Sequence, residues 1–252
     1  MIMSLSKIRK KQPLVHSITN YVVANFTANG LLAIGASPVM ADEAEEVEEM
    51  VSIASSLLIN IGTINTRTKE AMLLAGKRAN ELGIPVVLDP VGVGATSFRK
   101  QAVRELLDGV QFTLIRCNAG ELATIAGVQW EAKGVDSGEG EMDVAAVAKQ
   151  VAEQHHCLVI VTGPSDYLTD GHWEFFVAGG NERMTEVTGT GCLLSAICAA
   201  ALSLDGETIA NLRDVLADYK QVAEWAVQAE HLGSFQAEVL NGLHRLSLEG
   251  ER

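Results

Sequence analysis

The sequence has little cysteine: four residues in a chain of 252, with no Cys-x-x-Cys pair among them. Structural zinc sites usually contain closely spaced cysteine pairs, and the disulfide frameworks of small secreted domains have a high density of cysteines. The sequence therefore suggests neither kind of stabilisation. It favours a protein that works in a reducing compartment, and we expect the cytoplasm.

Long hydrophobic runs are also missing. The longest stretch of low polarity, Leu193 to Leu204, is about half the roughly 20 residues that a membrane-spanning helix needs. The basic patch from Lys7 to Lys11 is followed by Gln12 and Pro13, without the apolar core of a signal peptide. We expect a buried helix at 193–204, no export and no membrane partner.

Positive charge is scarce as well. The chain has 19 lysines and arginines against 32 acidic residues, a net charge of −13. This balance argues against binding to nucleic acid or to an anionic membrane, which depends on basic patches. An anionic ligand would need positive charge concentrated locally.

What the chain does contain is an alternation of short aliphatic runs and longer helical patterns, typical of parallel strands joined by crossover helices. Helices are expected at 42–54, with a solvated glutamate-rich face, and at 65–82, ending at Gly83. A hairpin turning at Asp170-Gly171 would add an antiparallel edge. The expected strands are Leu57–Ile61, Pro85–Leu88, Phe112–Ile115 and Leu158–Val161.

These elements are most simply assigned to a single α/β domain over 1–252, since no internal repeat divides the chain. The stretch from Lys133 to Glu141 is rich in glycine and acidic residues. We expect it to form an exposed connection.

A glycine-bracketed turn at 187–192, Val-Thr-Gly-Thr-Gly-Cys, opens directly into the apolar run. Such a turn can direct several backbone N–H groups at one anion, and the following helix adds the positive end of its dipole. A phosphoryl group in transfer suits that position. Taken by itself, the turn is explained equally well by a glycine-rich helix start that binds no ligand.

Polar residues follow the expected strands where each one ends, the edge at which open α/β sheets bind ligands. Asn118 and Glu121 are spaced to hold hydrated magnesium from one helical turn, although an ordinary capping box has the same spacing. Arg116, near the end of a strand, needs an anionic partner, either a nucleotide phosphate or a carboxylate of the protein.

Five sequence blocks together resemble the hydroxyethylthiazole kinase family, a thiamine-salvage branch of the ribokinase-like superfamily. They span most of the chain in the family's order. The blocks are His16–Asn20, Ala36–Ala41, Val87–Ala95, Asn118-x-x-Glu121 and Thr188–Cys192.

The resemblance implies an α/β, ribokinase-like three-layer fold with a central, mostly parallel sheet flanked by helices. It implies ATP as co-substrate, Mg²⁺ as cofactor, and phosphorylation of the hydroxyl of 4-methyl-5-(2-hydroxyethyl)thiazole in thiamine biosynthesis. It further implies a homotrimer with active sites at the subunit interfaces.

The resemblance also assigns site residues. Met40, Gly189 and, more loosely, Asn20 match thiazole-binding positions, while Arg116 and Thr162 match ATP-binding positions. His16 has a residue type that can titrate near neutrality, but a structural hydrogen-bonding role explains it at least as well, and we do not expect it to be catalytic. The remaining assignments are an anion hole from the amides of Thr190, Gly191 and Cys192, and a magnesium site, partly through water, at Asp89, Asn118 and Glu121.

Two departures bear on mechanism. Most ribokinase-like sugar kinases have an aspartate as proton acceptor where this chain has Cys192, as the thiazole-kinase branch does. A thiol at a helix N-terminus can have a lowered pKa, but phosphoryl transfer relies chiefly on positioning and charge stabilisation. Cys192 is thus expected to position the hydroxyl and assist only weakly.

The second departure, at 231–235, replaces part of an expected Gly-Pro-Gly-Ser-Phe-like segment.

Other functions are less consistent with the sequence. A pyrimidine kinase or a nucleotide-dependent repair dehydratase would share the glycine turn but not the blocks at 16–20 and 36–41. A dinucleotide-dependent oxidoreductase lacks support, because Gly92-x-Gly94 has no third glycine. A non-catalytic sensor of thiazole or nucleotide is favoured only by Cys192.

Overall fold

The computed structural model describes residues 4–128 and 142–249. Its centre is an eight-stranded sheet of order β2-β1-β3-β4-β5-β6-β7-β8, in which neighbouring strands are parallel except for the antiparallel pairs β6–β7 and β7–β8. The strands are β1 (Leu14–Ile18), β2 (Ser37–Val39), β3 (Ser56–Asn60), β4 (Val86–Asp89), β5 (Leu114–Asn118), β6 (Leu158–Thr162), β7 (Ser165–Thr169) and β8 (Glu174–Ala178).

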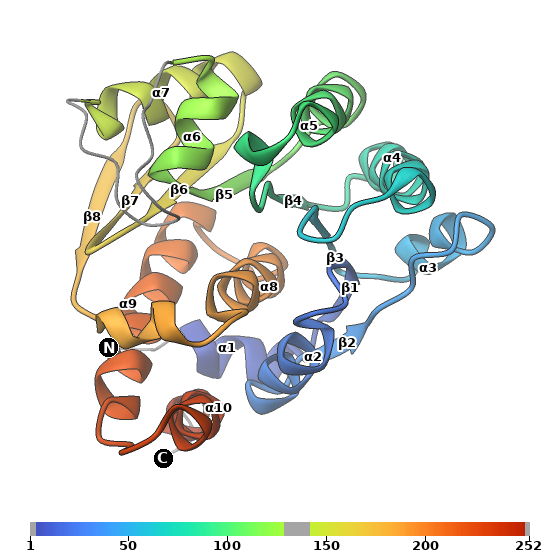
Figure 1. Cartoon of the computed structure of the whole chain (residues 1–252). Coiled ribbons are helices and arrows are strands. Elements are labelled where there is room, and N and C mark those ends of the chain that lie inside the picture. Colours follow the sequence, from blue (N-terminus) through green and yellow to red (C-terminus); the bar gives the residue numbers. More distant parts are fainter. Residues whose placement is uncertain (1–3, 129–141, 250–252) are drawn as a thin grey trace.

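Helices cover both faces of the sheet and make three layers (Figure 1). One face carries α3 (Val47–Ser52), α4 (Thr66–Leu82), α5 (Ser97–Gly109), α6 (Ala119–Ala126) and α7 (Val144–His155). The other carries α1 (Ser4–Lys11), α2 (Ala24–Ala33), α8 (Thr190–Leu202), α9 (Thr208–Ala226) and α10 (Leu232–Leu248). Short 3₁₀ turns lie at Val93–Ala95 and Glu182–Glu186.

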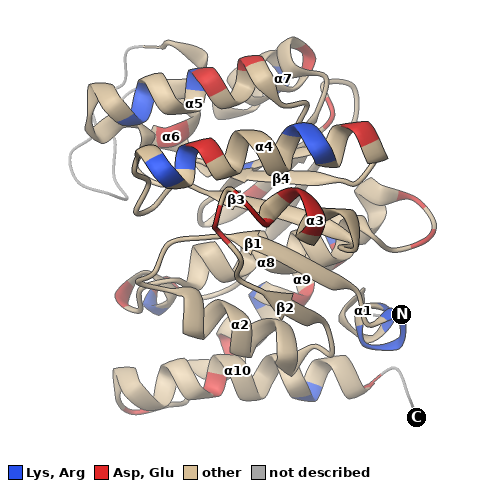
Figure 2. Cartoon of the chain, turned by 90° about the vertical axis from the view of Figure 1, so that its right-hand side faces the viewer, with Lys and Arg blue, Asp and Glu red and all other residues tan. Residues whose placement is uncertain are grey.

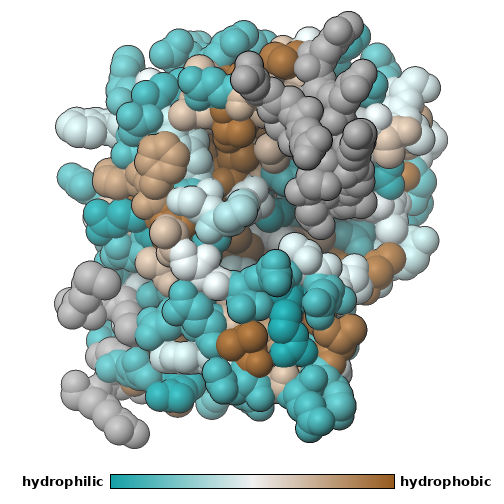
Figure 3. Space-filling model, turned by 60° about the vertical axis from the view of Figure 1, so that its left-hand side comes forward, coloured by the Kyte–Doolittle hydropathy of each residue, from teal (hydrophilic) through white to brown (hydrophobic). Residues whose placement is uncertain are grey.

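A separate hydrophobic core fills the space on each face. The expected buried helix at 193–204 is confirmed as α8, which begins three residues earlier and is buried along most of its length. Charged side chains lie on the outer helices, α3 to α5 among them (Figure 2). On the face shown in Figure 3, hydrophobic residues form separate small patches among hydrophilic ones.

All four expected strands are confirmed, with ends shifted by up to three residues, and so is the hairpin at Asp170-Gly171. Two strands were not predicted. In β1 the polar residues His16 and Ser17 interrupt the apolar pattern, yet both are buried because neighbouring strands flank β1 on each side. The strand β2 is only three residues long and contains Pro38.

The expected helix at 42–54 is wrong in extent, since α3 covers only Val47–Ser52. Asp42 is instead held by an ion pair with Arg67 at 3.1 Å, and the residues between form a turn. The glutamates around α3 are exposed, as expected. The helix expected at 65–82 is confirmed as α4: Asn65 accepts a hydrogen bond from the amide of Thr68, and Gly83 ends the helix with φ of +69°.

Within the described ranges, no helix combines the length and apolar character needed to cross a membrane. The connection expected at Lys133–Glu141 lies outside the described residues.

Candidate active site

The carboxyl ends of the parallel strands place polar side chains side by side at one edge of the sheet. Asn60 at the end of β3 is in register with Asp89 at the end of β4. Asn118 and Thr162 are likewise paired at the ends of β5 and β6. The expected convergence of strand ends is therefore present, and it sets the position of the site.

The glycine turn lies at this edge as the start of α8. Gly189 has φ of +94°, and a side chain there would meet Val23 at 2.7 Å, so glycine is needed for both conformation and space. The Thr190 hydroxyl donates to the Met184 carbonyl at 2.7 Å, and this bond ties the turn to the segment that precedes it. The first amides of α8, at Thr190, Gly191 and Cys192, are those that a helix leaves without intrahelical acceptors.

Arg116 on β5 lies directly against this turn. A Cβ at Gly191 would be 2.8 Å from its Nη1, so only glycine lets the guanidinium approach so closely. Arg116 Nη2 donates to the Thr162 hydroxyl at 2.6 Å. The two expected ATP-binding residues thus contact each other beside the expected anion hole.

A carboxylate of the protein accompanies Arg116, which was one of the two partners expected for it. Asp89 Oδ1 lies 3.8 Å from Arg116 Nη1, and Asp89 is fully buried. Burial raises the pKa of Asp89, whereas the nearby guanidinium acts in the opposite direction. For Arg116, burial disfavours the charge, but Asp89 and Glu121 outweigh it and raise the pKa.

Asn20, Asn60 and Cys192 extend this arrangement away from Arg116. Asn60 Nδ2 donates to Asp89 Oδ2 at 2.7 Å, and Asn20 Nδ2 donates to Asn60 Oδ1 at 2.9 Å. Asn20 Nδ2 also lies 3.6 Å from Cys192 Sγ. We call Asn20, Asn60, Asp89, Arg116, Thr162 and Cys192 the buried polar network.

The thiol of Cys192 does not have the lowered pKa that a helix N-terminus can produce. Burial, followed by the charge of Asp89, raises the pKa of Cys192 to about 12. These two effects outweigh the nearby Arg116 charge and the hydrogen bonds of Asn60 and Asn20, which act in the opposite direction. At neutral pH the group is a neutral thiol, which fits positioning better than proton abstraction.

Asn118 and Glu121 form the capping box that their spacing allowed. The Asn118 amide donates to Glu121 Oε2 at 2.9 Å, and the Glu121 amide donates to Asn118 Oδ1 at 2.8 Å. Glu121 Oε1 accepts from the amide of Gly92 at 2.9 Å. Burial and the charge of Asp89 raise the pKa of Glu121.

Asp89, Asn118 and Glu121 would suit a magnesium ion only through a single direct carboxylate or through water, because the oxygens of Asn118 and Glu121 already accept backbone hydrogen bonds. Across residues 4–128 and 142–249, no group of three His, Cys, Asp or Glu side chains is arranged to enclose a metal ion. Asp89 Oδ1, however, accepts no hydrogen bond from any described residue, and its ion-pair partner Arg116 Nη1 lies 3.8 Å away. Magnesium commonly keeps several waters and takes one or two carboxylates plus substrate phosphates.

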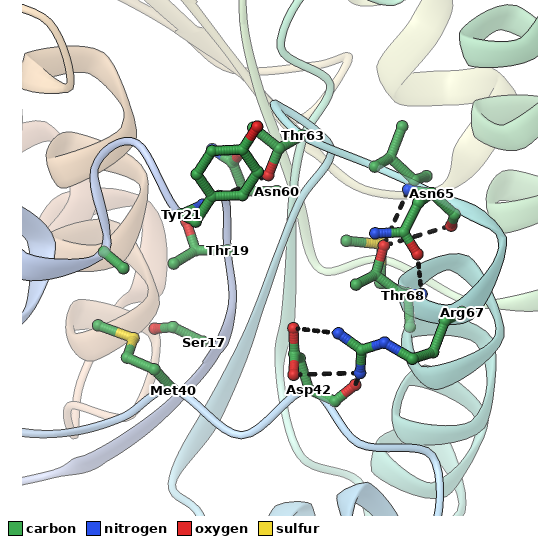
Figure 4. A pocket seen from close by; sticks show the side chains of 13 residues that line it. Ser17, Thr19, Tyr21, Met40, Asp42, Asn60, Thr63, Asn65, Arg67 and Thr68 are labelled. Atoms are coloured by element: carbon green, nitrogen blue, oxygen red, sulfur yellow. Dashed lines mark hydrogen bonds and ion pairs between the residues drawn. The ribbon is translucent and has the colours of Figure 1, made fainter.

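A cavity of about 240 Å³ opens beside the buried polar network, with Asn60 on its wall. Met40 lies on one side next to Ser17, and the Asp42–Arg67 ion pair lies opposite (Figure 4). The cavity is lined by Ser17, Thr19, Tyr21, Ala24, Met40, Asp42, Asn60, Thr63, Ile64, Asn65, Arg67, Thr68 and Met72. Met40 is therefore available to a ligand and is not merely a core residue.

His16 has the structural hydrogen bond that was expected of it. Its Nε2 lies 2.8 Å from the Ala41 carbonyl, which ties β1 to the segment just after Met40. Burial lowers the pKa of His16, with the hydrogen bond acting in the opposite direction. His16 thus supports the cavity wall as a buried imidazole.

Asn60 is the residue of this site that sequence reasoning missed. It joins Asn20 to Asp89 at the centre of the buried polar network. A buried amide closing an otherwise apolar strand was the available signal, since Leu57, Leu58 and Ile59 precede it.

The mostly parallel sheet flanked by helices defines a fold of the ribokinase-like class. A ribokinase-like superfamily protein from Enterococcus faecalis superposes with a TM-score of 0.69 over 95% of this chain and 89% of its own, at 12% identity. That similarity concerns the fold alone.

The sequence comparisons identify the branch. The chain belongs to the hydroxyethylthiazole kinase family, whose model matches residues 5–249, and it is therefore a phosphotransferase. The hydroxyethylthiazole kinase of Lysinibacillus sphaericus is 60% identical over 99% of this chain and 98% of its own. That of Haemophilus influenzae is 52% identical over 97% and 94%. The hydroxyethylthiazole kinase structure from Pyrococcus horikoshii, 40% identical, has a TM-score of 0.86 over 96% of this chain and 91% of its own.

Proposed function

We propose that the enzyme transfers the γ-phosphoryl group of magnesium-ATP to the hydroxyl of 4-methyl-5-(2-hydroxyethyl)thiazole, forming the phosphate ester and ADP in thiamine salvage. The observation that carries this is the contact of Arg116 with the Gly191 turn, next to a cavity that shares Asn60 with the buried polar network. Positive charge for a phosphoryl group and a pocket for an alcohol thus lie side by side.

On this proposal the cavity takes the thiazole, with Met40 against the ring and Asn20 and Gly189 toward the hydroxyethyl arm. Arg116 and Thr162 bind the phosphates of ATP. The amides of Thr190, Gly191 and Cys192 receive the negative charge that develops on the transferred group. Asp89, Asn118 and Glu121 would hold a magnesium ion, partly through water, and the bound ion would supply positive charge for the phosphates.

Cys192 serves this reaction as a positioning contact. The acceptor oxygen forms a bond to γ-phosphorus, the bond to the β-γ bridging oxygen breaks, and the hydroxyl proton leaves with the new phosphate ester or to solvent. A loose transition state makes little demand on a strong base. The neutral thiol of Cys192, 3.6 Å from Asn20 Nδ2, fixes the hydroxyl together with that amide.

Replacing Cys192 by serine tests this role. We expect Cys192→Ser to keep kcat within about tenfold of the wild type, because serine is smaller but still polar and the charge-stabilising groups remain. Steady-state kinetics at saturating ATP and thiazole would measure it. An inactive variant that still binds both substrates would contradict the positioning role.

We further propose that the enzyme is a homotrimer in which a neighbouring subunit completes each thiazole site. Tyr21 lines the cavity although 81% of its surface is exposed, and the adjacent Val22 is 58% exposed. A partner subunit over these side chains would bury them and close the cavity. Light scattering coupled to size exclusion would measure the oligomeric mass.

The proposal also includes a single kinase domain over 1–252 and a cytoplasmic location. The unbroken eight-stranded sheet supports the former. All four cysteines are free and buried, which agrees with a reducing compartment.

Mass-spectrometric detection of thiazole phosphate tests the function directly. Purified protein would be incubated with magnesium-ATP and hydroxyethylthiazole, with hydroxymethylpyrimidine and a sugar as competing acceptors. Thiazole phosphate as the sole product is expected. Phosphorylation of the pyrimidine alone would overturn the substrate, and thiazole binding without any product would indicate a sensor.

A further inference from the structure

Arg99 contacts two loops of the active-site edge at once, although it lies on an outer helix. It is the third residue of α5, where its amide donates to the Thr96 side chain at 3.2 Å. Its guanidinium turns back toward the sheet and donates to three backbone carbonyls. These belong to Ile61 at 2.9 Å, Gly62 at 2.7 Å and Val91 at 2.7 Å.

The first of these loops carries the wall of the cavity. Ile61 and Gly62 follow directly after Asn60, and the Gly62 amide donates to Asn60 Oδ1 at 2.9 Å. A Cβ on Gly62 would be 2.7 Å from Asn20 Nδ2, so the loop is packed closely against Asn20. Moving it would disturb both amides of the buried polar network.

The second loop leads from Asp89 to Glu121. Val91 follows Asp89 by two residues, and the next residue, Gly92, has φ of +65° and donates its amide to Glu121 Oε1. The position of Val91 therefore affects the two carboxylates to which we assign magnesium.

The three carbonyls lie beyond the ends of β3 and β4, where the sheet ladder no longer supplies donors. The Ile61 carbonyl also accepts from the Ile64 amide at 3.2 Å, so the carbonyls of Gly62 and Val91 depend most on Arg99. A guanidinium provides donors on separate nitrogens in a fixed plane and stays charged. Arg99 uses Nη1 for Ile61 and Val91 and Nη2 for Gly62. Lysine would keep the charge but place all donors on a single nitrogen.

We propose that Arg99 is a positioning residue that couples the acceptor side of the active site to its magnesium side. This proposal rests on the proposed function in one respect, namely the assignment of one loop to the thiazole site and the other to the magnesium site. Among the described residues, the Arg99 guanidinium donates hydrogen bonds to backbone carbonyls only, and it acts through Asn20, Asn60 and Glu121.

The test compares Arg99→Met, Arg99→Lys and the control Arg104→Met, which removes an exposed arginine from the same helix. Thermal midpoints are recorded with kcat, the KM for thiazole, and the free Mg²⁺ giving half-maximal rate at saturating ATP. A purely structural role would lower the thermal midpoint and leave the kinetics of the folded enzyme unchanged.

For Arg99→Met we expect kcat/KM for thiazole to fall by about tenfold or more, with a rise of at least about threefold in the Mg²⁺ requirement, because small displacements of catalytic groups cost large factors in rate. Arg99→Lys should remain folded and show the same two changes to a smaller extent. If Arg99→Met does not fold, the kinetics of Arg99→Lys test the coupling role.

The coupling role would be overturned if the Arg99 variants had the same kinetics as the wild type and as the Arg104→Met control, whatever their thermal midpoints. A change in the thiazole KM without a change in the Mg²⁺ requirement would overturn it too. Absence of thiazole phosphate with the wild-type enzyme would instead overturn the proposed function, and this proposal with it.

Discussion

Replacing Arg116 by methionine is expected to lower kcat by about 10³, within the range known for groups that stabilise charge in a phosphoryl or acyl transition state. The guanidinium is the positive group pressed against Gly191, and methionine keeps its stem while removing that charge. Steady-state kinetics with ATP varied would separate the effect on kcat from that on KM. The kcat of Arg116→Lys should lie between those of the wild type and Arg116→Met. Lysine keeps the positive charge but lacks the forked guanidinium that reaches Thr162.

Arg9→Met is the matched control. Arg9 is a part-buried arginine on α1 that bonds to Ser247 and to the Ala33 carbonyl, outside the strand-end site. It should change stability and leave the kinetics of the folded enzyme unchanged. If Arg116→Met retained kcat within threefold of the wild type, Arg116 would not be the phosphate-binding cation.

Loss of stability must be separated from loss of chemistry in this variant. Removing one partner of a buried pair leaves an uncompensated charge and typically costs about 3–5 kcal/mol, whereas removing both can be nearly neutral. Asp89 is fully buried, so Arg116→Met alone should destabilise the fold. The double variant with Asp89→Asn should regain much of that stability and remain inactive.

The sequence predicted the part of the fold that depends on local pattern. Aliphatic runs between helical segments placed β3 to β6, and the Asp170-Gly171 pair placed the hairpin. The strand β1 escaped because His16 is polar, and only its tertiary neighbours, β2 and β3, make a buried imidazole tolerable there. The helix α3 is shorter than the predicted helix at 42–54, because Asp42 instead forms an ion pair with Arg67, 25 residues away in the sequence.

The site was predictable to the extent that strand ends and a glycine turn specify it. Parallel strands necessarily bring Asp89, Asn118 and Thr162 to one edge. The distances that make Arg116 and Asp89 a pair, and the link through Asn60, depend on the register of separate strands and on α8. The raised pKa of Cys192 could not be foreseen either, because it follows from burial and from Asp89 rather than from its place at a helix start.

Asp89→Asn is expected to lower kcat by about 10²–10³, an effect of the size seen when one preorganised electrostatic group is removed from an active site. Asparagine matches the shape of aspartate, but one of its two ends must be an NH₂ group. If that end faces Asn60 Nδ2, two donors meet; if it faces Arg116, a donor meets the guanidinium. Either orientation disturbs the buried polar network and removes its negative charge.

Asp218→Asn is the matched control, since Asp218 is also buried but lies on α9, where it accepts a hydrogen bond from the Leu5 amide. Its kinetics per folded molecule should equal those of the wild type. An Asp89→Asn enzyme as fast as this control would show that the carboxylate takes no part in the reaction.

The magnesium requirement of Asp89→Asn then separates two roles of the carboxylate. If Asp89 acts only by orienting Arg116, its loss should change kcat and the KM for ATP in the same direction as Arg116→Met does, and the free Mg²⁺ giving half-maximal rate should stay at the wild-type value. We expect that Mg²⁺ concentration to rise as well, because Asp89 Oδ1 accepts no hydrogen bond among the described residues and has only the more distant Arg116 guanidinium beside it. A carboxylate oxygen beside phosphate-binding groups is the type of ligand that magnesium takes.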